Sequence, residues 1–333
     1  MPKKKIATHL LCRRPVSFAY LLFSLLFFGC IDNEKTAEDI AKIKVNVPIL
    51  RFDQEFAKAI PSDLPRLQRD YPYFFPEQYP DSIWAVKLKD TVQTELLEEV
   101  GAAFYSFGEQ ERDLERFFQH LKYYFPKVEI PKVVTLTSDV DYNNPVLLAD
   151  SLLLIGLDNY LGSEHKFYTG LPRYIAFGLD KKFLIRDVAM QFAKKIVPLS
   201  KRRTFLDRAV HYGKRLYVMD KLIPFVSEAR RIGYSEAQLG WAQANEEPLW
   251  RYFVERELLY DTDTKLVPRF LEVAPFSKFG LELDRESPGR IGRYLGWQIV
   301  RAFMEKNPVS LEQMLHLPAD EIFKRSGYKP KRQ

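Results

Sequence analysis

The first thirty residues constrain this chain most, because they predict where it folds and which cysteines it keeps. Five basic residues and no acidic residue precede an apolar run over 16–28, and Gly29 and Cys30 follow it directly. The thirteen residues of this run would span about 20 Å as a helix, which is short of a hydrocarbon core of about 30 Å. The run is therefore typical of a cleavable signal peptide and not of a membrane-spanning helix.

A small residue followed by cysteine at the end of such a run is the arrangement at which bacterial lipoproteins are acylated and cleaved. We therefore predict a signal peptide over 1–29, lipidation of Cys30, and a tether over 30–45. At least two acyl chains are needed for stable anchoring in a membrane. The folded domain is then expected outside the cytoplasm, in the cell envelope, on the inner or the outer membrane. The alternative is an uncleaved anchor or a buried apolar helix.

Processing at Cys30 would change the count of both cysteines and charges. Cys12 leaves with the signal peptide, so the mature chain cannot form an intrachain disulfide and must be stabilised by an apolar core. The whole chain has 50 basic and 44 acidic residues, and removal of the five basic residues in 1–29 leaves 45 against 44. The basicity of the unprocessed chain therefore gives no argument for nucleic-acid binding.

Helical periodicity dominates the chain from residue 91 onward. Prolines recur through 60–81 and exclude long helices there. Ser310 with Gln313 is typical of a capping box, and Gly327 of the residue that follows a helix end. Apolar residues at helical spacing predict helices over 91–107, 110–125, 183–196, 204–222, 235–259, 290–305, 310–316 and 319–326.

Strand signals are few. An apolar piece over 47–52 predicts an edge strand, because Pro48 lies near its start. Residues 132–137 alternate and are β-branched, and 151–155 form a second apolar run, so we expect two neighbouring antiparallel strands. The fold class is therefore α+β, mostly α-helical with one small sheet. We expect a single globular domain over 46–333, with an N-terminal part over 46–130 and the sheet plus the C-terminal helices over 131–333.

No residue pattern indicates catalysis. The four histidines outside the signal peptide are isolated from one another, so no i,i+4 pair could present two imidazoles to zinc. Glycine-rich phosphate loops and nucleophile elbows are absent from the sequence. Residues 139–144 carry the oxygen ligands of a calcium loop but lack its glycine and distal glutamate, and turn chemistry explains them better. We therefore predict no enzyme activity, no cofactor, no metal site and no small-molecule substrate.

Charge is distributed unevenly along the chain. Residues 30–130 contain 13 basic and 19 acidic residues, whereas 181–233 contain 14 basic and 4 acidic residues. A charged helix face is usually just a solvated face. The other interpretation is a surface that docks an acidic partner or anionic lipid head groups. On that interpretation the partner-facing basic residues are Arg202, Arg203, Lys214 and Arg215.

Several segments resemble one protein family. Residues 287–308 read SPGRIGRYLGWQIVRAFMEKNP, and LPADEI and SGYKP follow at 317–322 and 326–330. With IGLDNYLG at 155–162 and YYFP at 123–126, these segments resemble the gliding-motility lipoprotein B family of Bacteroidota. The resemblance implies a non-enzymatic, membrane-anchored lipoprotein of the gliding-motility or type IX secretion apparatus, whose partners are other proteins of that apparatus.

That family is similar to predicted zinc proteases of zincin-like fold, which carry H-E-x-x-H on one helix and a glutamate ligand on a later one. The corresponding helices here are 183–196, which has no histidine, and 204–222, where Tyr212 and Gly213 stand at the glutamate position. The resemblance therefore implies a zincin-like fold without the metal site. The alternatives are a degenerate hydrolase that uses carboxylates instead of histidines, and a glycan- or substrate-binding lipoprotein that uses the aromatic residues of 71–84.

Overall fold

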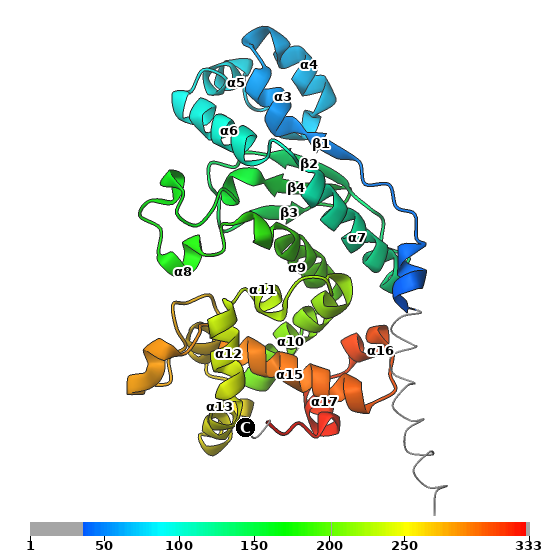
Figure 1. Cartoon of the computed structure of the whole chain (residues 1–333), viewed down its shortest axis with the longest axis vertical. Coiled ribbons are helices and arrows are strands. Elements are labelled where there is room, and N and C mark those ends of the chain that lie inside the picture. The colour runs from blue at the N-terminus through cyan, green and yellow to red at the C-terminus, as the bar shows by residue number, and fades with distance from the viewer. Residues whose placement is uncertain (1–35, 201, 331–333) are drawn as a thin grey trace, which may run out of the picture. The chain divides into compact units, whose positions relative to one another are not determined.

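A four-stranded mixed sheet organises the N-terminal half of the fold. In the computed structural model, which describes residues 36–200 and 202–330, the strand order is β1–β2–β4–β3 (Figure 1). Strands β1 and β4 run parallel to β2, whereas β3 runs antiparallel to β4. The strands are β1 (Ile49–Arg51), β2 (Lys132–Leu136), β3 (Val146–Leu148) and β4 (Leu152–Gly156).

The sheet confirms two strand positions and corrects one direction. β1 lies at the edge, as its neighbouring proline predicts. β2 and β4 are neighbours, but the prediction that they are antiparallel is wrong, since Val134 pairs with Leu154 in a parallel register. The reason is β3, which is too short to show alternation in the sequence. β3 lies at the edge of the sheet beyond β4. A tight turn after β3 reverses the chain, so that β4 lies between β3 and β2 and runs parallel to β2.

Helices cover both faces of the sheet. Successive strand residues point to opposite faces, so Val134 packs into a smaller aromatic cluster while Val133 packs into the main core. The smaller cluster lies under α3 (Phe52–Lys58), α4 (Leu64–Asp70), α5 (Asp81–Lys87) and α6 (Thr91–Ala103), which Figure 1 shows on one side of the sheet. The other side is covered by α7 (Gly108–Tyr124) and α9 (Leu184–Ile196).

The C-terminal half is built from helices, and most lie where periodicity predicts them. The predicted helix over 235–259 is wrong as one piece, because Pro248 lacks the N–H that a continuous helix would need, and the chain breaks at Asn245. The remaining helices are α8 (Arg173–Ala176), α10 (Phe205–Leu222), α11 (Glu228–Ile232), α12 (Glu236–Ala244), α13 (Glu246–Glu255), α14 (Leu266–Phe270), α15 (Ile291–Lys306), α16 (Leu311–His316) and α17 (Ala319–Ser326).

Side-chain caps explain where several helices begin. The predicted capping box of Ser310 and Gln313 is present at α16, and Gly327 ends α17 in the left-handed conformation. Thr204 and Asp207 form another capping box, which fixes the start of α10. Seven short 3-10 segments connect the larger elements: η2 (Pro61–Asp63), η3 (Pro72–Phe74), η4 (Leu157–Asn159), η5 (Lys166–Tyr168), η6 (Lys181–Phe183), η7 (Leu258–Tyr260) and η8 (Glu282–Glu286).

Two structural units divide the chain at Lys44. Residues from Val45 onward form one unit, and the described part of the other is helical over 36–41. The signal peptide and Cys30 lie outside the described residues. Among the helices of 36–200 and 202–330, none is long and apolar enough to cross a membrane.

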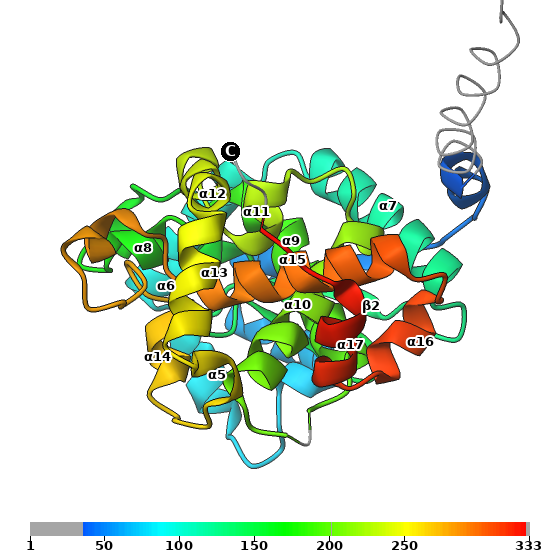
Figure 2. The ribbon, with the colours of Figure 1, turned by 90° about the horizontal axis from the view of Figure 1, so that it is seen from below.

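The closest helix contact in the core joins α10 to α15, which cross as Figure 2 shows. A Cβ atom on Gly213 would overlap the carbonyl oxygen of Gly296, and one on Gly296 would overlap that of Ala209. Beyond the crossing, the Asp220 carboxylate accepts hydrogen bonds from Trp297 Nε1 at 2.8 Å and from the Arg301 guanidinium at 2.8 and 2.9 Å. Glycine is therefore required at both crossing positions, because the two backbones meet there.

We expect Gly213→Ala or Gly296→Ala to lower the free energy of unfolding by about 3 kcal/mol, because backbone atoms cannot move aside as a flexible side chain can. The matched control is Gly240→Ala in α12, where no atom lies within 4 Å of the added methyl group. That change should stabilise the protein by about 0.5–1 kcal/mol through helix propensity. Urea denaturation of the three variants measures this, and equal effects at all three positions would contradict the close crossing.

Candidate functional site

The helices that would carry the metal ligands of a zincin, α9 and α10, lie beside a hollow of about 430 Å³. Its lining comes from α8, from α9, from α10, from the start of α15 and from the loop around Tyr142. We call it the basic hollow, because five cationic side chains line it: Arg186, Lys194, Arg215, Arg290 and Arg293.

Among the residues that the structure describes, only Arg186 of these five cations has a carboxylate partner. Asp187 accepts from Arg186 Nη1 at 2.5 Å and from the Tyr160 hydroxyl at 3.0 Å, and it is the one acidic residue in the lining. Within residues 36–200 and 202–330, no ion pair links the other four cations to an acidic side chain. The hollow therefore has five positive charges against one negative charge.

Backbone carbonyls and aromatic rings hold the arginines in place. Arg290 precedes α15 at a φ of 64° and donates from Nη2 to the carbonyl oxygen of Gly233 at 2.6 Å. Arg293, one turn later, donates from Nε to the carbonyl oxygen of Leu271 and places its guanidinium 4.1 Å from the centre of the Tyr212 ring. Arg215 lies against the same ring, at 5.3 Å. The guanidiniums thus converge from two crossing helices.

Burial and mutual repulsion make these charges costly. Burial lowers the pKa of Arg290 to about 9, and the neighbouring Arg293 and Arg186 add to the shift. Burial likewise lowers the pKa of Arg293 to about 10 and lowers the pKa of Lys194, next to Arg215 and Arg186. With pKa values of about 9 and about 10, Arg290 and Arg293 still carry their charge at neutral pH, so the hollow is a region of uncompensated positive charge.

The four basic residues predicted to face a partner do not share one surface. Arg202 and Arg203 are exposed, and Arg202 Nη1 pairs with Asp320 at 2.8 Å. Lys214 is buried, and its ammonium donates to the carbonyl oxygens of Leu315 and Leu317 at 2.9 and 2.7 Å. The prediction that Lys214 faces a partner is therefore wrong. Arg215 lines the basic hollow instead. Adjacent helix residues point about 100° apart, which separates Lys214 from Arg215.

A second hollow, of about 420 Å³, lies on the other side of α10, where Arg202, His211 and Lys214 contribute to the lining. Burial lowers the pKa of Lys214 to about 8. Burial, with the charges of Arg215 and Lys214, lowers the pKa of His211 to about 4. The imidazole of His211 is therefore neutral in the folded protein at neutral pH. Asp207 and His316 also line this hollow, but no three His, Cys, Asp or Glu side chains among the described residues are placed to hold one metal ion.

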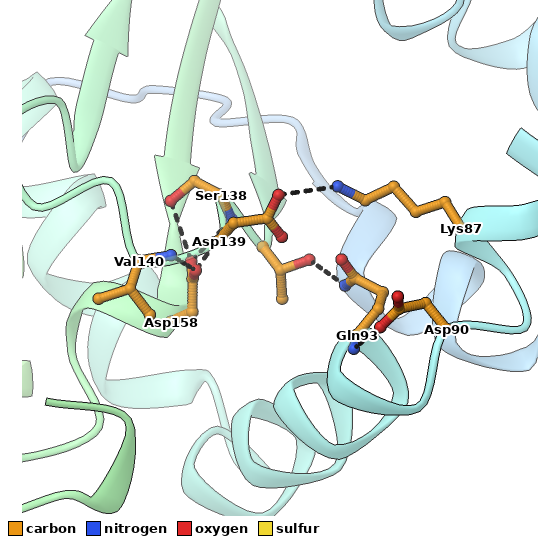
Figure 3. A network of polar contacts seen from close by, with 8 residues as sticks. Lys87, Asp90, Gln93, Ser138, Asp139, Val140 and Asp158 are labelled. Carbon is orange, nitrogen blue, oxygen red and sulfur yellow. Dashed lines mark hydrogen bonds and ion pairs between the residues drawn. The ribbon is translucent and has the colours of Figure 1, made fainter. Parts of the chain in front are cut away.

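The acidic loop of 139–144 is held by protein partners. Figure 3 shows Asp139 directed at Lys87, 3.0 Å away, and the buried Asp158 accepting from the backbone N–H groups of Ser138 and Val140. Asp139 and Val140 both have positive φ, so Asp158 holds a strained turn. Across 36–200 and 202–330, no three His, Cys, Asp or Glu side chains are placed to hold one metal ion.

The aromatic residues of 71–84 build the smaller core cluster. Tyr71 and Phe75 are buried against Phe52, and Trp84 packs edge-on against Phe75 with ring centroids 4.9 Å apart. Tyr79 alone of this group is mainly exposed. A sugar platform needs open ring faces side by side, and these rings turn theirs toward one another, which removes the feature that the glycan-binding alternative requires.

Of the five cations of the basic hollow, only Arg215 was singled out from the sequence, as one of the residues predicted to face a partner. Arg290 and Arg293 lie in the segment that resembles the family, and Arg186 and Lys194 lie within the basic stretch. The available signal was therefore a local excess of positive charge. Their convergence depends on the α10–α15 crossing, which no local pattern reports.

The low pKa of His211 predicts that acid destabilises the fold. The folded protein binds a proton at His211 less readily than the unfolded chain, whose histidine pKa is about 6.5, so stability is lost as pH falls from about 6.5 to about 4. His211→Gln should reduce that loss by about 1–2 kcal/mol after solvent screening is allowed for. His316→Gln, at an exposed position, is the control. Urea denaturation at pH 7 and pH 4.5 measures both, and equal acid sensitivity in the two variants would contradict the prediction.

The family comparison supplies the identity of the chain. No curated protein and no solved structure matches it. A family model described as "Gliding motility protein GldB" matches residues 33–330, which covers both core clusters, the sheet, the basic hollow and the C-terminal segments that carry the resemblance. Because the match extends over nearly the whole folded part, the chain belongs to the GldB family of gliding-motility proteins.

Proposed function

We propose that this protein is a non-enzymatic, membrane-anchored lipoprotein of the gliding-motility apparatus, held in the cell envelope by a lipid on Cys30. The observation that carries the proposal is the family match over 33–330, which begins just after the predicted lipidation site. The protein would act through contacts with other motility proteins, including those of the associated type IX secretion machinery. In this proposal the segment over 30–45 is the tether between the lipid and the folded part.

The electrostatics of the basic hollow support a non-enzymatic role over a degenerate hydrolase. A hydrolytic zinc ion needs about three ligands that donate electron pairs, and α9 and α10 present Arg186, Lys194 and Arg215 beside the hollow. These cations repel a divalent metal ion, and the single carboxylate, Asp187, is already engaged by Arg186 and Tyr160. The side chains beside α9 and α10 therefore do not provide the negative charge that a zinc site requires.

The anchor is tested by Cys30→Ser in the native strain. We expect the variant to move from the membrane fraction to the soluble envelope fraction and cells to lose spreading on agar, because no acyl chain can attach to serine. Cys12→Ser is the matched control, since it removes the other cysteine of the chain and should leave both readouts unchanged. Normal spreading of a strain that lacks the gene, or membrane retention of Cys30→Ser, would contradict the proposal.

The partner surface is tested best at Arg203. Arg202 is already paired with Asp320, so reversing the charge of Arg202 would also place two carboxylates together. Among the described residues, no ion pair engages Arg203. We expect Arg203→Glu to weaken pull-down of other motility proteins several-fold without changing the melting temperature, because a reversed rim charge repels an acidic partner. Lys58→Glu, an exposed reversal on α3, is the control. Full recovery of partners by Arg203→Glu would show that this charged face is only solvated.

A further inference from the structure

We propose that the basic hollow binds the phosphate group of a small organic ligand. The inference goes beyond the role in motility and does not depend on it, since it rests on the side chains that line this hollow. It assigns a ligand class to a region that the family match leaves without a role.

The first argument is the imbalance of charge. Buried or half-buried cations in proteins are normally paired, because an unpaired charge in a region of low dielectric is costly. Asp220 in the same core illustrates the rule, since Arg231 and Arg301 both pair with it. In the basic hollow, the half-buried Arg215, Arg290 and Arg293 have no carboxylate partner among the described residues, nor does the exposed Lys194 at its rim. An anionic ligand would supply the missing countercharge.

The second argument is a pair of unused hydrogen-bond donors. The Nε atoms of Arg215 and Arg290, like that of Arg231 beside Asp220, are buried and have no acceptor within the described part of the chain. A buried donor without an acceptor costs free energy that a bound oxyanion would recover. Both side chains line the same hollow, one from α10 and one from the start of α15. Two of these three unused donors belong to side chains of the hollow, which adds to the argument from charge.

The geometry of the arginines is pre-organised. Arg290 is held by the carbonyl oxygen of Gly233 and lies at a positive φ, a conformation that a non-glycine residue adopts only when its surroundings enforce it. Arg293 is held over the Tyr212 ring and bonded to the carbonyl oxygen of Leu271. Guanidiniums fixed in this way lose little freedom when they bind, which favours recognition of a planar pair of acceptor oxygens.

The number of cations in the hollow and its volume both favour an organic phosphate as the ligand. A phosphate monoester carries about −1.5 to −2 charges and three acceptor oxygens, which matches several converging cations better than a single carboxylate does. The hollow, at about 430 Å³, is in the range of small-molecule sites. Tyr142, Tyr174 and Phe177 add aromatic lining beside the cations, where the organic part of a ligand would pack. The ligand is either a soluble phosphate monoester or a phospholipid head group, which share this chemistry.

Calorimetry on the full chain in detergent tests the proposal, with glycerol 3-phosphate and inorganic phosphate as probes and citrate for comparison. We expect saturable binding of glycerol 3-phosphate with a dissociation constant below about 1 mM at low salt. The affinity should rise between pH 5 and pH 7, as the phosphate loses its second proton near pH 6. Absence of saturable binding by either phosphate, or equal affinity for citrate, would overturn the assignment.

Two variants connect binding to this hollow. Lys194→Gln with Arg215→Gln should weaken binding about ten- to a hundredfold, because two charge-assisted contacts are lost. Lys195→Gln is the matched control, since Lys195 is the next residue of α9 and lies 3.9 Å from Asp150, outside the hollow. If the double variant does not fold, the single change at the exposed Lys194 replaces it and should weaken binding several-fold. Unchanged affinity in a folded variant would overturn the proposal.

A vesicle experiment separates the two sources of the phosphate group. The Cys30→Ser chain is used, so that an attached lipid cannot itself insert. Sedimentation with phosphatidic acid vesicles, reversed by free glycerol 3-phosphate and absent with phosphatidylcholine, would support a lipid head group. Binding of glycerol 3-phosphate without sedimentation would support a soluble ligand. Sedimentation that Lys194→Gln with Arg215→Gln does not reduce would overturn the role of the hollow.

Discussion

The fold depends on the close crossing of α10 and α15 at Gly213 and Gly296. Because neither position has a Cβ atom, the two backbones come into contact and the flanking side chains are brought to the same level. On one side of the crossing, Asp220 of α10 receives Trp297 and Arg301 of α15. On the other side, the side chains of both helices line the basic hollow. One packing constraint thus builds both the core and the candidate site.

Some charged side chains of the core are fully paired, and others are not. Asp220 is surrounded by donors that match its charge and its lone pairs, and the buried Lys214 donates to two carbonyl oxygens at the junction of α16 and α17. Such groups tie helices together, although Arg231 beside Asp220 also keeps a buried Nε without an acceptor. The basic hollow differs, since Arg215, Arg290 and Arg293 have no carboxylate partner among the described residues. That contrast within one molecule is why we assign a ligand to the hollow and a structural role to Asp220 and Lys214.

The side chains beside α9 and α10 are unsuited to a metal ion. The sequence resemblance relates α9 and α10 to the helices that hold zinc in predicted proteases. In this chain Arg186, Lys194 and Arg215 occupy the space beside those helices, so the electrostatic potential there suits an anion and opposes a cation. A fold does not by itself confer an activity, which depends on the side chains at the site.

Local sequence determined most of the helices of this protein, together with the capping box at Ser310, the helix end at Gly327 and the edge position of β1, because these features depend on neighbours a few residues away. The prediction that Cys30 is lipidated rests on the sequence alone, as does the absence of a zinc-binding H-E-x-x-H motif. Tertiary structure decided the rest. The parallel pairing of β2 with β4 depends on where β3 packs, and the burial of Lys214 depends on α16. The basic hollow joins Arg186 to Arg290, about a hundred positions apart, and only the packing of helices across the core can bring such residues together.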